Sequence, residues 1–386
     1  MLIKRTIYNG IKKTVFGEQK VIILYGPRQA GKTTLINQLT TELPADATLS
    51  FTGDDLRTQE IFSQPILHNL KTIIGKKKFL IIDEAQRIEN IGLTLKLLHD
   101  NLPVQIIASG SSSFDLANKI NEPLTGRTKT FFLHPLSWKE AKEGLSVNPP
   151  PTEIERLEQY LRYGMYPKVI TVTDNQSRQD YLLDFINSYL YRDILNFEQI
   201  RKPKKVIDLL SLLALQIGME VSIEELSHSL KLAKPIVEKY LDVLEKMFLI
   251  YNLRGFSRNL RSEITKTSKY YFYDLGIRNA LIRNFNPLNI RADKGNLFEN
   301  YAVMERIKSL SNNNKFANFY FWRTYDQKEI DLIEEREGEL KAFEFKFSPE
   351  AKKKPLALSL FTKTYIHSKA MFITPNNINN FLYSSA

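Results

Sequence analysis

The feature that most restricts the fold of this 386-residue chain is a glycine-bounded loop that ends in lysine and threonine. It reads Gly26-Pro27-Arg28-Gln29-Ala30-Gly31-Lys32-Thr33, which matches the pattern G-x-x-x-x-G-K-[ST]. The apolar run 21–25 before it predicts a buried strand, and residues 34–39 after it have helical spacing. Strand, loop and helix in this order predict a site where backbone N–H groups and a helix N-terminus face a phosphate group.

Each residue type in the loop has an expected role. Gly26 and Gly31 let the backbone curl around the anion, and Lys32 reaches the β- and γ-phosphates of ATP. The Thr33 hydroxyl is expected to bind Mg²⁺. The other residues expected to contact the nucleotide are Pro27, Arg28, Gln29, Ala30 and Thr34. The alternative, a strand-to-helix turn that merely contains two glycines and a lysine, is disfavoured by the flanking pattern.

A second apolar strand, residues 78–84, ends in two carboxylates. An unbroken apolar run is typical of a central parallel strand that is buried on both faces. Asp83 is expected to hold Mg²⁺ together with Thr33, and Glu84 is expected to orient the attacking water as general base. The alternative is a buried strand followed by a solvated acidic turn.

A third apolar strand, residues 104–108, leads into small hydroxyl residues. Ser109 is the candidate polar sensor between the phosphate group and the acidic strand. Ser111, Ser112 and Ser113 are read equally well as caps of the next helix. Strands are also expected at 48–52 and 130–133, and strands that alternate with helices predict an α/β fold with a parallel sheet.

The composition narrows the class of protein without deciding its function. Apolar residues make up 43% and charged residues 25%, as in ordinary globular proteins, and the absence of cysteine excludes disulfides and thiolate zinc sites. No apolar stretch has the length of a membrane span, and the charged N-terminus does not resemble a signal peptide, so we expect a cytoplasmic protein. The net charge of +11 suits a nucleic-acid partner or a merely basic protein.

Several motifs together resemble a family of prokaryotic AAA-type (AAA+) P-loop ATPases. Besides the loop, they are Ile81-Ile82-Asp83-Glu84-Ala85-Gln86, Ser109-Gly110-Ser111-Ser112, Leu124-Thr125-Gly126-Arg127, His134-Pro135-Leu136-Ser137-Trp138, Tyr163-Gly164-Met165-Tyr166-Pro167 and Tyr191-Arg192-Asp193. The resemblance implies hydrolysis of ATP with Mg²⁺. It also implies that Arg127 stabilises γ-phosphate charge, either in its own chain or in a neighbouring subunit, as an arginine finger does. The alternative for Arg127 is a surface ion pair, and Arg28 and Arg192 are weaker candidates for the finger.

The resemblance and the composition divide the chain into four expected parts. They are an ATPase domain (1–147), a helical lid or linker (152–200), a winged-helix-like domain (201–274) and a restriction-endonuclease-like domain (275–386). The proline-rich break 148–151 separates the first two.

The third part has the order of a helix-turn-helix. Ser222 begins a capping box and a short helix, and residues 234–246 form the second helix. The apolar residues on one face of this helix are Ile236, Val237, Tyr240, Leu241, Leu244 and Met247. The following wing is basic, with Arg254, Arg258, Arg261, Lys266 and Lys269, but the second helix also carries acidic residues. Contact with double-stranded DNA and a structural or protein-docking role therefore stay equally open.

The last part is predicted to form a helix, three strands, a helix and a strand, an order that resembles the restriction-endonuclease-like core. Asp331 and Glu344 would share Mg²⁺, Lys346 would polarise the phosphate or a water, and Glu299 would complete the site. Pattern alone favours the alternative, an ordinary half-exposed strand with a cross-strand ion pair.

Two hypotheses about function follow. The first is an ATPase coupled to DNA binding or processing. The second is an ATP-dependent conformational switch whose C-terminal parts bind protein partners and have no nuclease activity. A kinase for a small metabolite is a third possibility, but it leaves the winged-helix region without a purpose.

Overall fold

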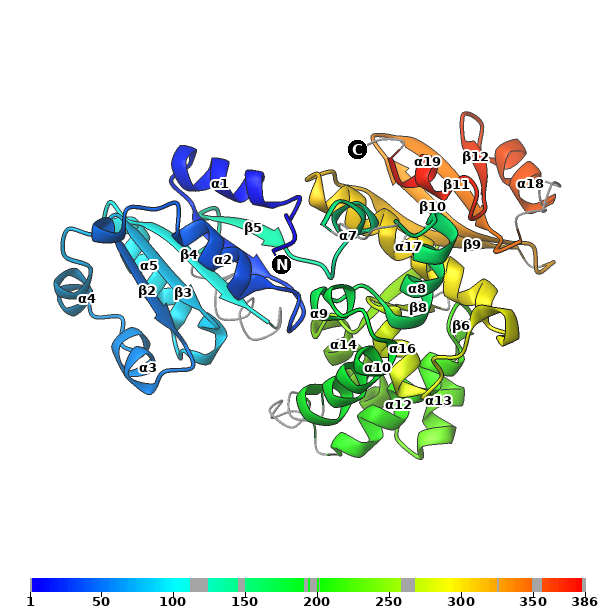
Figure 1. The fold of residues 1–386 in the computed structure, drawn as a ribbon, viewed down its shortest axis with the longest axis horizontal. Coiled ribbons are helices and arrows are strands. Elements are labelled where there is room, and N and C mark those ends of the chain that lie inside the picture. Colours follow the sequence, from blue (N-terminus) through cyan, green and yellow to red (C-terminus); the bar gives the residue numbers. More distant parts are fainter. Residues whose placement is uncertain are drawn as a thin grey trace. The chain divides into compact units, whose positions relative to one another are not determined.

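The structure, a computed structural model, describes residues 2–111, 124–144, 150–190, 194, 200, 202–257, 268–324, 326–348 and 356–383. Figure 1 shows the order of the helices and strands along the chain. The chain forms two compact units. The nucleotide unit comprises residues 2–136 and 246–248, and the C-terminal unit comprises residues 137–245 and 249–386.

The nucleotide unit is built on a five-stranded sheet. Its strands are β1 (Val21–Tyr25), β2 (Thr48–Thr52), β3 (Phe79–Asp83), β4 (Gln105–Gly110) and β5 (Thr128–Phe132). They lie in the order β2-β3-β4-β1-β5, and every neighbouring pair is parallel. The predicted α/β fold with a parallel sheet is confirmed.

Helices cover this sheet because its central strands are apolar on both sides. They are α1 (Tyr8–Gly17), α2 (Lys32–Thr40), α3 (Leu56–Ser63), α4 (Leu67–Ile74) and α5 (Ile91–Asn101), with short 3₁₀ turns η1 (Ala45–Ala47) and η2 (Ala85–Arg87). Apolar side chains of α1 and α2 form one core cluster with β1, β4 and β5, and α5 contacts β4, α3 and α4. Residues 56–74 form two helices rather than one, because Pro65 disfavours helical geometry at the residue before it.

The C-terminal unit contains a seven-stranded mixed sheet. Its strands are β6 (Glu220–Val221), β7 (Ile250–Gly255), β8 (Ser268–Phe272), β9 (Asn318–Arg323), β10 (Glu329–Arg336), β11 (Glu339–Phe345) and β12 (Lys369–Ile373). The order is β12-β11-β10-β9-β7-β8-β6. Because β7 pairs with β9, the sheet continues across the boundary expected at 274/275, and the winged-helix-like and nuclease-like parts share one sheet.

Helices line both faces of this sheet and extend beyond it. They are α7 (Trp138–Gly144), α8 (Glu153–Tyr163), α9 (Pro167–Thr171), α10 (Asn175–Asp184), η3 (Phe185–Leu190, a π-helix), α12 (Pro203–Leu215), α13 (Ile223–Leu230), α14 (Lys234–Lys246), α16 (Leu275–Leu281), η4 (Leu288–Ile290), α17 (Lys294–Asn312), α18 (Leu356–Thr364) and α19 (Ile378–Tyr383). Phe361 of α18 packs on Trp322, whereas Phe381 of α19 packs on Phe343, so α18 and α19 cover opposite faces.

The motif Tyr163-Gly164-Met165 has a structural role at the junction of α8 and α16. The buried Asp274 carboxylate accepts hydrogen bonds from the backbone N–H of Met165 (2.6 Å) and of Gly276 (2.9 Å), at the start of α16. Gly164 has φ +75°, and a Cβ there would lie 2.0 Å from an Asp274 oxygen. This close approach requires glycine, and it ties α8 to α16.

Two consecutive helices, α13 and α14, occur where the helix-turn-helix is predicted. The Ser222 hydroxyl accepts a hydrogen bond from the backbone N–H of Glu225 at the start of α13. On α14, Val237, Tyr240, Leu241 and Leu244 are buried, whereas Ile236 is 40% exposed. Arg258, Arg261 and Lys266 of the expected wing lie outside the described residues.

Among the described residues, no helix has both the length and the apolar character needed to cross a membrane.

Candidate nucleotide site and acidic cluster

The phosphate loop lies at the carboxyl end of β1 and leads into α2. Gly26 has φ +156°, and a Cβ there would lie 2.2 Å from the Leu133 carbonyl oxygen. Gly31 has φ +98° and precedes the first residue of α2. Both positions therefore require glycine, for the close backbone approach at Gly26 and for left-handed geometry at Gly31. The result is a curved backbone at a helix N-terminus, as expected for an anion cradle.

Lys32 is folded back onto its own loop. Only 4% of the residue is exposed, and its Nζ donates hydrogen bonds of 2.9 Å to the carbonyl oxygens of Gly26 and Pro27. An ammonium group has three donors, and two of them are used by these backbone oxygens. The lysine side chain therefore lies where the sequence pattern places phosphate.

The buried Arg5, near the start of the chain, forms a hydrogen bond with the backbone of the phosphate loop. Arg5 donates from one Nη to the Ala30 carbonyl (2.7 Å) and from the other to the His134 carbonyl (2.6 Å). This role of Arg5 is not predictable from the sequence, because nothing local distinguishes it from other N-terminal basic residues. The His134 carbonyl that accepts the second of these hydrogen bonds belongs to the motif His134-Pro135.

Threonine, aspartate and serine meet beside the loop. The Thr33 hydroxyl donates to Asp83 Oδ2 at 2.7 Å, and the Ser109 hydroxyl donates to Asp83 Oδ1. The sheet order explains this, because β4 lies between β1 and β3 and all three strands end at one edge. The three predicted residues are brought together, and a hydroxyl with a carboxylate is a suitable donor set for Mg²⁺.

Glu84 follows Asp83 with φ +49°, in left-handed geometry. Its carboxylate accepts hydrogen bonds from the Gln86 amide and from the Ser111 hydroxyl, the latter at 3.3 Å. The Gln86 amide also donates to Ser111 at 3.1 Å. Gln86 and Ser111 therefore orient the predicted general base, a role the sequence analysis did not assign to them. Ser112 and Ser113 lie outside the described residues.

Arg127 lies at the other edge of the sheet. Its carbonyl accepts from the Val21 N–H at the start of β1, and Val21 pairs with Thr128. The phosphate loop begins after the opposite end of this five-residue strand, about 17 Å away at 3.3 Å per residue. The structure therefore does not bring Arg127 to the loop of its own chain.

The Arg127 guanidinium pairs instead with Asp100. Its Nε lies 2.7 Å from Asp100 Oδ1, and both side chains are about one-third exposed (37% and 31%). Arg127, and secondly His99, lower the pKa of the Asp100 carboxyl. Of the weaker finger candidates, Arg28 is half-buried within the loop, and Arg192 lies outside the described residues.

A second group of ionisable side chains lies in the seven-stranded sheet. The Asp331 carboxylate is 7% exposed and accepts from the Phe345 N–H at 2.8 Å, while Lys346 Nζ lies 2.9 Å from Glu344 Oε1. The register of β9 with β10 shifts between Ile330 and Ile333, so Asp331 lies at a β-bulge. Bulges of this kind commonly re-aim a side chain beside an active site.

The two carboxylates of this group resist ionisation. Burial, followed by the charges of Glu299 and Glu344, raises the pKa of Asp331 well above its usual value. Burial also raises the pKa of Glu344, although the Lys346 ammonium opposes the shift. Glu344 Oε2 is buried and has no hydrogen-bond partner among the described residues. The predicted set of Asp331, Glu344, Lys346 and Glu299 is thus electrostatically coupled.

Lys269 and Tyr271 of β8 extend the cluster. Lys269 is 1% exposed, and its Nζ contacts Glu329 and lies 3.3 Å from Glu299 Oε1. Burial alone would lower the pKa of Lys269, but the surrounding carboxylates, Glu299 first, raise it. The Tyr271 hydroxyl donates to Glu299 Oε1 at 2.6 Å. Lys269 was predicted to lie in a wing. Its position inside an aromatic strand, 268–272, is the sequence signal that could have indicated a buried lysine.

The described residues contain no group of three or more His, Asp or Glu side chains arranged to hold a metal ion. Two carboxylates with one unpartnered oxygen still form a donor pair for a divalent ion.

Comparison with known proteins agrees with this geometry. Residues 18–142 match a family model described as AAA domain. Residues 154–288 and 294–381 match two models described as domains of unknown function, DUF8612 and DUF4143. The nucleotide unit therefore has an AAA-type P-loop fold.

Relatives with similar sequences are themselves uncharacterized proteins. One from Mycobacterium tuberculosis is 27% identical over 351 residues, which cover 90% of this chain and 74% of its own length. One from Methanocaldococcus jannaschii is 26% identical over 301 residues, covering 74% and 66% respectively.

Similar solved structures include a mutant RuvB from Thermogota maritima and AMPPCP-bound DnaA from Aquifex aeolicus. The RuvB structure has a TM-score of 0.34 and 15% identity, and the match covers 65% of this chain and 90% of that one. The DnaA structure has a TM-score of 0.30 and 17% identity, with coverages of 62% and 87%.

Proposed function

We propose that this protein binds ATP and hydrolyses it to ADP and phosphate in its nucleotide unit. The contact between Thr33 and Asp83, with Ser109 on the other carboxylate oxygen, carries this proposal. It joins the phosphate loop to the acidic strand through the residues that hydrolysis requires.

Each residue of the nucleotide site has a separate proposed role in ATP hydrolysis. Lys32 leaves the loop carbonyls to bind the β- and γ-phosphates, while Thr33 and Asp83 hold Mg²⁺, which neutralises phosphate charge when bound. Glu84, oriented by Gln86 and Ser111, accepts the proton of the attacking water. Ser109 positions Asp83.

Three variants test this proposal in a steady-state ATPase assay with a parallel nucleotide-binding measurement. Lys32→Ala is expected to lose ATP binding, and Glu84→Gln is expected to bind ATP but to turn over about 10²–10⁴-fold more slowly. Glu89→Gln is the matched control, since Glu89 is exposed on the same segment, and it should behave as the parent protein. Undiminished hydrolysis by Lys32→Ala would refute the proposal.

We further propose that ATP hydrolysis is coupled to binding of double-stranded DNA by the C-terminal unit. The order α13, α14, β7, β8 and the net charge of +11 support a DNA-contacting module. The charge pattern of α14 limits this support, because Lys234 is paired with Glu224 at 2.7 Å. DNA-stimulated ATPase activity that falls steeply with salt is expected. Stimulation by a protein partner instead of DNA would favour the conformational switch.

The acidic cluster supports a second activity, metal-dependent cleavage of a phosphodiester. The observation that favours it is the buried, unpartnered Oε2 of Glu344 beside Asp331, because a divalent ion would supply the missing partner. Lys346, half exposed, would contact the scissile phosphate.

Cleavage is tested with Mg²⁺ or Mn²⁺ on single- and double-stranded DNA and on RNA. Glu344→Gln and Lys346→Ala are expected to abolish cleavage, whereas Glu337→Gln, a change in the exposed β10–β11 turn, should retain it. Cleavage that persists in Glu344→Gln would exclude this site.

A further inference from the structure

The C-terminal unit contains a cavity that neither proposed activity uses. It lies among α8, α9 and α10, which Figure 1 draws in green, and has a volume of about 270 Å³. Its lining includes two charged side chains, Arg156 and Arg178, and no carboxylate among the described residues. The other polar lining groups are Gln159, Tyr160, Tyr163, Thr171 and Thr173.

Arg178 is held rigidly in the wall of the cavity. It is 9% exposed, its Nε donates to the carbonyl oxygens of Val169 (3.2 Å) and Val172 (2.8 Å), and its Nη1 donates to Asn175 Oδ1 (3.0 Å). The guanidinium carbon lies 5.6 Å from the centre of the Tyr163 ring. Within the described chain its Nη2 makes no hydrogen bond, so one donor edge is left for a ligand.

Arg156 reaches the same cavity from α8. It is 8% exposed, and its Nε donates to the Pro151 carbonyl at 3.2 Å. Its guanidinium lies beside Tyr160, where it opposes the effect of burial, which raises the pKa of that phenol. The Arg156 guanidinium also makes a side-chain hydrogen bond with Tyr160 in the wall of this cavity.

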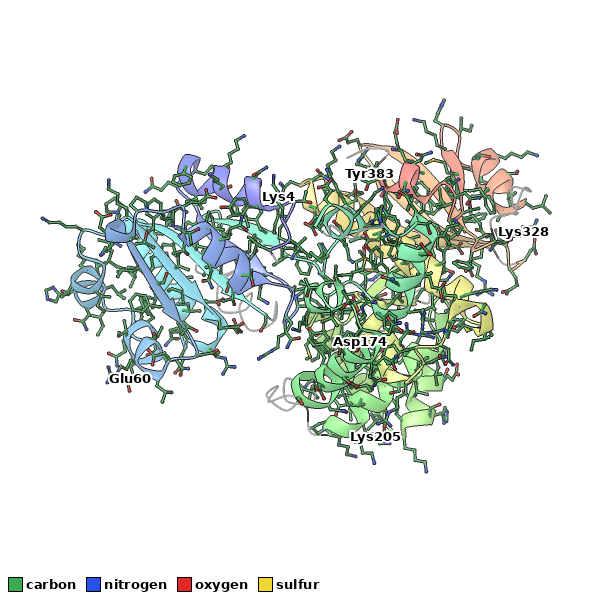
Figure 2. The ribbon with its side chains drawn as sticks, viewed as in Figure 1. Lys4, Glu60, Asp174, Lys205, Lys328 and Tyr383 are labelled. Carbon is green, nitrogen blue, oxygen red and sulfur yellow. The ribbon has the colours of Figure 1, made fainter. Side chains whose placement is uncertain are left out.

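Neither guanidinium has a carboxylate within 4 Å among the described residues. Among carboxylates, that of Asp174 contributes to the electrostatics of Arg178, and Figure 2 labels Asp174 at the start of α10. That carboxylate is exposed and accepts the Ser177 N–H at 2.7 Å, as the N-cap of α10. Two buried positive charges in one cavity without a counterion are unfavourable, and an anionic ligand would remove that cost.

We propose that this cavity binds the phosphate group of a small phosphate monoester. Two guanidinium groups match the charge of about −2 that a phosphate monoester concentrates on one group near neutral pH. A carboxylate carries a single charge, and a dicarboxylate such as succinate divides its two charges between its ends. Guanidinium forks are also suited to several hydrogen bonds with one phosphate. The space beside the phosphate is bounded by Tyr160 and Tyr163 and takes a compact organic group such as a pentose.

The proposal is tested by isothermal titration calorimetry on the full chain. The probes are ribose 5-phosphate, inorganic phosphate and succinate, with ADP and Mg²⁺ present in excess to occupy the phosphate loop. Ribose 5-phosphate is expected to bind, inorganic phosphate to bind more weakly, and succinate to show no measurable binding.

The variants separate a ligand role from a structural one. Arg156→Gln is expected to weaken ribose 5-phosphate binding about tenfold or more, because a hydrogen bond to a charged group is lost. Arg178→Lys keeps the charge but loses the fork and should weaken binding by a similar factor. Lys168→Gln is the matched control, since Lys168 on α9 is exposed and does not line the cavity, and it should leave the affinity within about twofold.

Arg178→Lys also removes contacts to two backbone carbonyls, so its thermal unfolding is measured first. If it does not fold, Arg156→Gln decides alone, because that residue makes one backbone hydrogen bond. Absence of binding by both phosphate probes would overturn the proposal. So would a folded Arg156→Gln variant with unchanged affinity, or binding of succinate in preference to ribose 5-phosphate.

Discussion

The position of Arg127 leads to a prediction about how the ATPase is assembled. Arg127 precedes β5 at the edge of the sheet where β1 begins, about 17 Å from the loop at the other end of that strand. An arginine finger in the same chain is incompatible with this register. If Arg127 acts on ATP, it acts on the nucleotide of a neighbouring subunit.

We expect Arg127→Ala to lower kcat for ATP hydrolysis by about 10³-fold or more, the range measured when arginine fingers are removed. Its effect on folding should be small, since both side chains of the pair with Asp100 are about one-third exposed and solvent screens such pairs. Asp100→Asn is the matched control, because it breaks the same ion pair but leaves the arginine. It should match Arg127→Ala in thermal stability and retain ATPase activity.

A mixing experiment locates the action of the finger. Arg127→Ala and Lys32→Ala are each expected to be inactive alone. Mixed subunits should regain activity, because a Lys32→Ala subunit can supply Arg127 to a neighbour whose loop is intact. Unchanged turnover in Arg127→Ala would show that the residue serves only its ion pair, and a mixture without recovery would refute action between subunits.

Three further predictions concern the loop and the seven-stranded sheet. Gly26→Ala is expected to lose ATP binding and to destabilise the nucleotide unit by at least about 1 kcal/mol in calorimetry, because the alanine Cβ would lie 2.2 Å from a backbone oxygen. Normal ATP binding by this variant would contradict the prediction. Arg306→Met breaks a buried pair with Glu334 (2.6 Å) and should cost about 3–5 kcal/mol in urea unfolding. Glu224→Gln, at an exposed pair, should cost far less. Equal losses in the two variants would be inconsistent with that burial. Asp331→Asn should raise stability at pH 8 and have little effect near pH 4, because the raised folded-state pKa makes ionisation unfavourable as pH rises; a gain that is largest in acid would reverse the inferred sign.

Much of the nucleotide site could be predicted because its signals are local. The loop, the strand before it and the helix after it are contiguous, and the period of each apolar run indicates its own secondary structure. The general rule that parallel strands end at one edge brings Asp83 and Ser109 toward Thr33. Asp331 and Glu344 lie on neighbouring antiparallel strands because the chain between them is a short hairpin, which is also a local feature.

The remaining features depend on which distant segments pair. The sequence alone determined that a phosphate loop, an acidic strand and an α/β sheet occur in this chain. Only the tertiary structure decided that Arg127 lies at the far edge, that Arg5 supports the loop, and that one sheet extends from β6 to β12. Strand order and register depend on packing between segments that are far apart in the sequence. The local sequence of a strand does not specify which distant segment it pairs with. For the same reason, no sequence motif predicts that Arg156 and Arg178, on separate helices, line one cavity.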